Sequence, residues 1–126
     1  MINRVIVAGG RDFADRDFLY QKLDHLLSQM EGEIIIVSGG ASGADALGEL
    51  YALERGLKKE VFRARWSELG KGAGPARNQE MAEHATHAVC FWDGRSRGTK
   101  DMISRAKKQG LKLRVVMYGD TKNYRD

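Results

Sequence analysis

The sequence predicts an α/β protein with a single doubly wound parallel sheet, and three observations support this. Short apolar runs occur at residues 4–8, 33–37, 60–63, 88–92 and 112–118, and their starts lie about 25–30 residues apart, the length of one strand plus one crossover helix. The run at 33–37 is β-branched and does not alternate with polar residues, which is typical of a strand covered on both faces. The segments between the runs have helical spacing, so strands and helices alternate.

The four segments between the predicted strands each carry helix signals. Apolar residues recur at helical spacing over residues 19–30, and Asp15 is placed to cap the start of that helix. A second helix is predicted over 44–55, and Pro75, typical of a first helical turn, begins the third. The fourth spans residues 99–109 and is followed by a glycine. Right-handed crossovers place such helices on both faces of the sheet.

The size and composition of the chain predict one globular unit. The chain has 126 residues, which predicts one domain over 1–118 and a polar tail over 119–126. Hydrophobic residues at 42% and charged residues at 30% exclude extensive disorder. Lys and Arg total 21 against 17 Asp and Glu, and these charges are mixed along the chain. The balance suits an anionic ligand without requiring nucleic acid.

Cysteine usage and hydropathy predict a cytoplasmic protein. Cys90 is the one cysteine, so no internal disulfide framework exists, and its apolar neighbours predict a core position. No apolar run approaches the about 18 residues of a membrane span, so we expect no membrane partner. Arg4, Arg11 and Asp12 interrupt the N-terminal segment, which therefore lacks the apolar region of a secretory signal.

Glycines gather in four segments that each lie between a predicted strand and a predicted helix. These segments are residues 9–12, 38–45, 70–78 and 93–99. Because the carboxyl ends of parallel strands share one edge of a sheet, the four segments are expected to converge there. Any one glycine-rich turn is ordinary turn geometry, but four at one edge favour a ligand site. Glycine lets backbone approach a ligand, and helix starts offer N–H groups to anions, so a phosphate-bearing small molecule is predicted.

The candidate ligand-binding residues come from these segments and from one tryptophan before the third helix. They are Gly9, Gly10, Arg11, Ser38, Gly39, Gly40, Gly43, Asp45, Trp66, Gly72, Gly74, Arg77, Asn78, Asp93, Gly94, Ser96, Gly98 and Thr99. Arg77 is expected at a phosphate, because the guanidinium fork matches phosphate oxygens. The N–H groups of Gly98 and Thr99 are expected to bind phosphate as well. Trp66, predicted in a loop, is placed to stack on a base.

Three of these candidates have a structural alternative. Asn78 either binds a ribose hydroxyl or caps its own helix. Asp45 either binds ribose hydroxyls or caps the second helix, since a carboxylate beside a phosphate is repulsive. Arg11 either faces the ligand or forms an ion pair with Asp12 or Asp15.

Several common chemical motifs are absent from the sequence. Residues 9–14 lack the G-x-G-x-x-G spacing of a dinucleotide fold, and no G-x-x-x-x-G-K-[ST] occurs. There is no G-x-S-x-G nucleophile elbow. The three histidines are scattered and there is no Cys/His cluster, so neither a metal nor another cofactor is expected.

Four motifs in order resemble the YspA/YpsA-related branch of the SLOG superfamily, which is named for the Smf/DprA DNA-processing proteins and the LOG cytokinin-activating enzymes. They are VIVAGGRDF at 5–13, SGGASGAD at 38–45, GPARNQEM at 74–81 and FWDGRSRGT at 91–99. The resemblance extends from about residue 4 to residue 117. It implies a compact Rossmann-like, three-layer domain with strand order 3-2-1-4-5. It also implies a nucleotide-derived ligand above the strand ends.

The resemblance also brings in a hydrolytic chemistry. LOG enzymes hydrolyse the N-glycosidic bond of nucleoside 5′-monophosphates, using the arginine of an R-K-x-x-M motif and the glutamate of P-G-G-x-G-T-x-x-E. The segment from Arg77 is similar to the first motif, with Asn78 in place of lysine. In the second, Met102 stands where the glutamate falls. Asp101 lies one residue earlier and so points about 100° away on a helix. Hydrolysis needs a carboxylate to act on water or on the oxocarbenium-like charge, and Asp45, Glu49 and Asp101 stay open for that role.

Three functions are therefore weighed, and whether the protein is an enzyme stays open. Binding of a nucleotide-derived, phosphate-bearing molecule leads, because the four loops come without a settled carboxylate. The alternatives are a LOG-type phosphoribohydrolase, with Arg77 and Asp101 catalytic, and single-stranded DNA binding as in DprA relatives. We do not expect nucleic acid as a partner, because the basic residues at 107–108 and 112–114 lie at the far end of the last helix. A homodimer through the first helix is left open.

Overall fold

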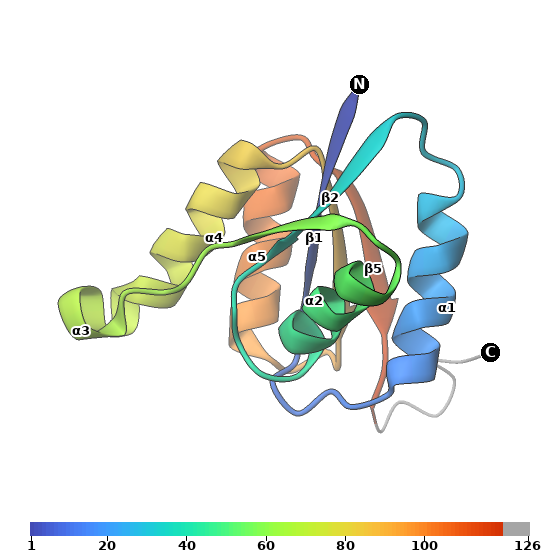
Figure 1. The fold of residues 1–126 in the computed structure, drawn as a ribbon. Coiled ribbons are helices and arrows are strands. Elements are labelled where there is room, and N and C mark those ends of the chain that lie inside the picture. The colour runs from blue at the N-terminus through green and yellow to red at the C-terminus, as the bar shows by residue number, and fades with distance from the viewer. Residues whose placement is uncertain (120–126) are drawn as a thin grey trace.

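A computed structural model describes residues 1–119, and one five-stranded sheet organises them (Figure 1). All strand pairs are parallel and the order is β3-β2-β1-β4-β5. The predicted fold class and strand order are thereby confirmed. The strands are β1 (Ile2–Gly9), β2 (Glu33–Ser38), β3 (Lys58–Val61), β4 (His87–Trp92) and β5 (Lys112–Met117).

Helices cover both faces of the sheet, as Figure 1 shows. The helices α1 (Arg16–Leu27) and α2 (Ala44–Glu54) pack on one face. The helices α4 (Ala73–His84) and α5 (Arg97–Lys108) pack on the other. Asp15 caps α1 as predicted, since its Oδ1 accepts from the N–H of Phe18 at 3.2 Å.

The central strand β1 separates two hydrophobic cores. Val5 and Val7 point to α1 and α2, whereas Ile6 points to α4 and α5. All three are fully buried, so each contributes about 1.5–3 kcal/mol of apolar burial. Cys90 on β4 is also fully buried, which confirms its predicted core position, and burial raises its thiol pKa to about 12.

The structure corrects the prediction around β3. The strand covers residues 58–61 rather than 60–63, because the backbone of this edge strand pairs with β2 from Lys58, opposite Ile35, to Val61, opposite Ser38. Its two lysines also form ion pairs. Lys58 pairs with Glu33 of β2 at 3.2 Å, and Lys59 pairs with Glu49 of α2 at 3.3 Å. Arg63 is consequently not a strand residue but follows β3 in a loop.

The segment from Trp66 was predicted as a loop, and that prediction is wrong. Trp66 begins the short helix α3 (Trp66–Leu69), closed by a bond from the N–H of Leu69 to the carbonyl of Arg65 at 2.9 Å. The 3-10 turn η1 (Gly70–Gly72) then leads directly into α4. Pro75 lies in the first turn of α4, where its missing N–H would have no intrahelical acceptor.

The remaining boundaries differ little from prediction. Helix α5 begins two residues early, at Arg97, because Ser96 is its N-cap and accepts from the N–H of Thr99 at 3.4 Å. Most of the predicted polar tail, residues 120–126, lies outside the described residues. No helix within residues 1–119 is long and apolar enough to cross a membrane.

Candidate functional site

The carboxyl ends of the strands open into two adjoining cavities. The aspartate cavity, of ≈ 350 Å³, is lined by Ala8, Gly9, Gly10, Arg11, Asp12, Ala41, Asp45, Arg77, Asn78, Met81, Ser96, Gly98, Thr99 and Met102. The arginine cavity, of ≈ 330 Å³, is lined by Arg11, Gly39, Gly40, Ala41, Ser42, Arg63, Ala64, Trp66 and Arg77. Three residues line both: Arg11, Ala41 and Arg77.

Most of the predicted ligand-binding residues therefore come together at this edge of the sheet. Those that line neither cavity are Ser38, Gly43, Gly72, Gly74, Asp93 and Gly94, together with the candidate catalytic residue Asp101. The cavities also include residues outside the predicted site, above all Arg63 and the apolar Met81. Arg63 is not among the predicted site residues because the strand was predicted to include it. The charged residues at 58–60 were the signal that the strand begins earlier and ends before Arg63.

Two of the residues outside the cavities hold the loops that line them. The hydroxyl of the buried Ser38 donates to Glu49 Oε2 at 2.8 Å and accepts from the N–H of Gly40 at 3.1 Å. The Oδ1 atom of Asp93 accepts from the N–H groups of Arg95 and Ser96, both at 2.8 Å. These backbone hydrogen bonds hold the pKa of Asp93 below its usual value. Both side chains shape the site from behind.

The first glycine loop has a packing explanation that the sequence did not reveal. A Cβ atom on Gly10 would lie 1.8 Å from the hydroxyl oxygen of Tyr118. One on Gly43 would lie 2.1 Å from the carbonyl oxygen of Gly10, and Gly43 has a φ of +75°. Gly43 is therefore required by the contact between the β1 loop and the start of α2, whereas Gly10 leaves room for the Tyr118 hydroxyl.

Gly98 has no such explanation. It lies in the first turn of α5 and lines the aspartate cavity, and a Cβ atom there would meet nothing within 4 Å. The hydroxyl of Ser96 occupies the N–H of Thr99, which leaves the N–H groups of Arg97 and Gly98 as donors without an intrahelical partner. The open space therefore lies next to free backbone donors.

Arg77 forms the wall between the two cavities. Its Nη1 donates to the carbonyl oxygen of Gly39 at 2.5 Å, and its Nε donates to Asn78 Oδ1 at 3.0 Å. A Cβ atom on Gly39 would lie 2.5 Å from Arg77 Nη1 and 2.8 Å from Asp45 Oδ2, so this glycine admits both charged groups. Burial lowers the pKa of Arg77, and the charge of Asp45 opposes that shift.

Asp45 brings a buried carboxylate to the aspartate cavity. Only 5% of the residue is exposed, and its Oδ2 accepts from the N–H of Ala41 at 3.3 Å. Burial raises the pKa of Asp45 to about 6, although the Ala41 hydrogen bond and the charge of Arg77 act in the opposite direction. The side chain bonds to the loop before α2, and the N-cap residue Gly43 has no side-chain capping bond. Asp45 therefore does not cap α2.

Asn78 and Asp101 form a polar link between α4 and α5. Asn78 Nδ2 donates to Asp101 Oδ2 at 2.9 Å and to the carbonyl oxygen of Gly98 at 3.4 Å. The same Asp101 oxygen accepts from Arg105 Nε at 2.9 Å. Asn78 therefore ties its helix to α5 and does not cap it. Asp101 lies behind Asn78 and off the cavity wall, while Met102 lines the aspartate cavity.

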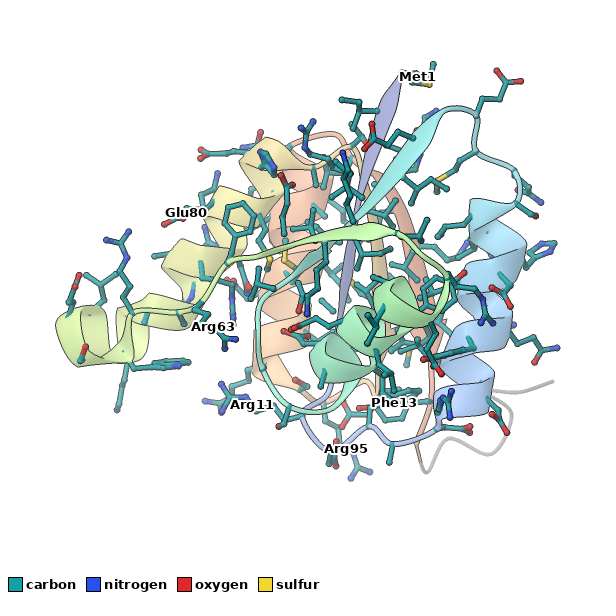
Figure 2. All side chains as sticks on the ribbon, in the orientation of Figure 1. Met1, Arg11, Phe13, Arg63, Glu80 and Arg95 are labelled. Carbon is teal, nitrogen blue, oxygen red and sulfur yellow. The ribbon has the colours of Figure 1, made fainter. Side chains whose placement is uncertain are left out.

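Arg11 and Trp66 complete the arginine cavity. The Arg11 guanidinium lies 5.6 Å from the centre of the Trp66 ring, and the tryptophan is half-exposed. Arg11 forms no ion pair within the described part of the chain, so the predicted alternative with Asp12 or Asp15 is not observed. Figure 2 shows Arg11 and Arg63 near one another at the carboxyl end of the sheet.

Fold and cavities together define a Rossmann-like α/β domain with a polar double cavity at the carboxyl edge of its sheet. The sequence model of the YspA, cpYpsA-related SLOG family matches residues 3–68. Gene 61 protein of Mycobacterium phage D29 is 34% identical over 127 residues, which cover 94% of this chain and 98% of that protein. The chain belongs to the YspA, cpYpsA-related SLOG family.

A solved structure shares the fold. It is DNA processing protein A (DprA) from Streptococcus pneumoniae, with a TM-score of 0.75 and 21% sequence identity. The match covers 99% of this chain and 54% of that chain, so the chain spans about half the length of DprA. At this level of identity the likeness shows the fold alone.

Proposed function

We propose that the protein binds a nucleotide-derived, phosphate-bearing small molecule across the two cavities. The observation that carries the proposal is the position of Arg77, which lines both cavities. Its hydrogen-bond partners are the neutral oxygens of Gly39 and Asn78, and no carboxylate in residues 1–119 pairs with it. An arginine oriented in this way keeps its charge available for a phosphate group.

The rest of the double cavity suits the other parts of a nucleotide. Asp45 lines the aspartate cavity, and a carboxylate can accept from hydroxyl donors such as those of ribose. Met81 and Met102 lie beneath the aspartate cavity and are buried in the core there. The family resemblance points to the same ligand class.

Thermal shift with a ligand series tests the proposal. The series contains AMP, GMP, CMP, ADP-ribose, NAD, cyclic nucleotides and ribose 5-phosphate, with adenosine as the unphosphorylated comparison. A ligand at 100 times its Kd adds about 2.7 kcal/mol of stability, which is several degrees in Tm for a domain of this size. Arg77→Gln is expected to abolish the shift, whereas Arg114→Gln, an exposed arginine on β5 away from both cavities, retains it.

Two results would contradict the proposal. One is the absence of a shift with every phosphate-bearing compound. The other is a shift that survives Arg77→Gln unchanged. Salt-dependent binding of a single-stranded oligonucleotide, without any response to nucleotides, would favour the DNA-binding alternative instead.

A second candidate function, hydrolysis of the N-glycosidic bond, is favoured by Asp45. A carboxyl group with a pKa raised to about 6 exchanges protons close to neutral pH, as an acid or base acting on water must. Asp101, another candidate carboxylate for this role, is instead bonded to Asn78 and Arg105. Chromatography of the same mixtures decides the matter. Free base that appears with the native chain and not with Asp45→Asn would identify a hydrolase, and intact ligand would identify a binding protein.

A further inference from the structure

We infer that the arginine cavity holds the phosphoryl group of the ligand and the aspartate cavity holds its uncharged part. This inference rests on the proposed function and assigns the orientation of the ligand within it. The sequence predicts phosphate at the start of α5, but that segment lines the aspartate cavity.

The two cavities differ in formal charge. Arg11, Arg63 and Arg77 line the arginine cavity, and no carboxylate lines it. In the aspartate cavity the carboxylates of Asp12 and Asp45 balance Arg11 and Arg77, which line both cavities. A doubly charged phosphate is repelled by these carboxylates, whereas ribose hydroxyls can donate to them.

The three arginines of the cavity also lack counter-charges. Within residues 1–119 none of them forms an ion pair. Elsewhere in the same part of the chain, five arginines are paired with carboxylates, namely Arg4, Arg16, Arg55, Arg65 and Arg105. Arg95, Arg97 and Arg114 are also unpaired there, but they line neither cavity. The charge of Arg11 contributes to the lowered pKa of Arg77, so these cations repel one another. An anion in the cavity removes this repulsion.

The surrounding residues hold the arginines in place. Gly40 has a φ of +73°, and a Cβ atom there would lie 3.1 Å from Arg63 Nη1, so the bare backbone leaves room for the Arg63 side chain. Arg11 lies on the face of the Trp66 indole. The N–H groups of Gly40 and Ala41 already donate to Ser38 and Asp45. Recognition in this cavity therefore falls to guanidinium groups.

Isothermal titration calorimetry with AMP, pyrophosphate and adenosine tests the orientation. Two matched variants are compared with the native chain: Arg63→Gln in the arginine cavity and Arg97→Gln in the first turn of α5. Both residues are exposed, and neither forms an ion pair within residues 1–119, so both variants are expected to fold. Loss of one charge-assisted bond in Arg63→Gln is expected to weaken AMP and pyrophosphate about tenfold or more. Arg97→Gln is expected to leave them within about twofold, and adenosine is unaffected by either change.

Tryptophan fluorescence gives an independent readout. AMP and pyrophosphate are expected to change the emission of the native chain, and Trp66→Phe abolishes that change because Trp66 borders the arginine cavity. If AMP binds and Arg97→Gln weakens it while Arg63→Gln does not, the orientation is overturned and the proposed function stands. If none of the probes binds, both are overturned.

Discussion

Replacing Asp45 by asparagine is expected to stabilise the fold, and to do so more at high pH. The carboxyl group is buried in the folded chain, and its pKa rises from 3.8 to about 6. Because the folded state favours the neutral form, the stability associated with this group is fully present below pH 3.8 and is lost as the pH rises through about 6. Asparagine is neutral throughout and keeps an oxygen that can accept from the N–H of Ala41.

The magnitude follows from the pKa shift of Asp45. One pKa unit is worth about 1.4 kcal/mol, so a rise from 3.8 to about 6 lowers the free energy of unfolding at pH 8 by about 3 kcal/mol, relative to its value at low pH. At pH 5 the carboxyl group is still largely protonated in the folded chain, and the loss of stability is about half as large as at pH 8. The advantage of Asp45→Asn therefore grows by about 1.4 kcal/mol between pH 5 and pH 8, which is about 5 °C in Tm for a domain of this size.

Thermal unfolding of both chains at pH 5 and pH 8 measures this growth. Any fixed change in hydrogen bonding at the asparagine cancels between the two pH values, so the difference of differences isolates the ionisation. Asp17→Asn, which removes an exposed carboxylate from α1, is the control and is expected to shift Tm equally at both pH values. An Asp45→Asn shift that is the same at pH 5 and pH 8, or that is smaller at pH 8, would refute the reasoning.

Three further substitutions test other parts of the site. Gly98→Ala is expected to stabilise the fold by about 0.5 kcal/mol, because glycine weakens a helix and a Cβ atom meets nothing there. The same change is expected to weaken AMP binding. Denaturant unfolding measures the stability and calorimetry the affinity, and an unchanged affinity would contradict a ligand role for Gly98. Ser96→Ala removes the cap of α5 and is expected to cost about 1 kcal/mol in denaturant unfolding; an unchanged midpoint would count against the cap. Gly43 has a φ of +75° and a 2.1 Å contact for an added Cβ atom, so Gly43→Ala is expected to lower the free energy of unfolding by more than about 3 kcal/mol. Gly56 has a φ of +68° and open space, so Gly56→Ala is expected to lower it by about 1 kcal/mol. Equal losses in the two variants would contradict the packing argument.

The fold could be predicted because its signals are local. The unalternating run at 33–37 requires cover on both faces, and the central strand of the sheet carries the same kind of run at 4–8. Repeated spacing between runs leaves room for one helix at a time, so the strands are parallel. The edge strand β3 was placed two residues late because it begins with charged residues, Lys58 and Lys59, which lack the apolar pattern of a strand. Its start is set by backbone pairing with β2, which leaves no local pattern.

The candidate site was predicted less completely, because its contacts are tertiary. The loop containing Gly10 has the composition of a phosphate-binding loop, yet a Cβ atom on this glycine would meet the hydroxyl of Tyr118, which lies more than a hundred residues away in the chain. The sequence offers Asp101, next to Met102, as a catalytic carboxylate, but the packing of α4 on α5 brings it into a hydrogen bond with Asn78. Arg63 could not be predicted as a cavity residue because its position depends on where β3 ends.

The strongest argument for a ligand is that the features which weaken the fold lie at one edge of the sheet. Asp45 is buried at a pKa that reduces stability above pH 6, and Gly98 lies in a helix with room for a larger side chain. Arg11, Arg63 and Arg77 converge without a counter-charge in residues 1–119. Selection for stability alone would remove each of these features, whereas binding of a phosphate-bearing ligand would account for all of them.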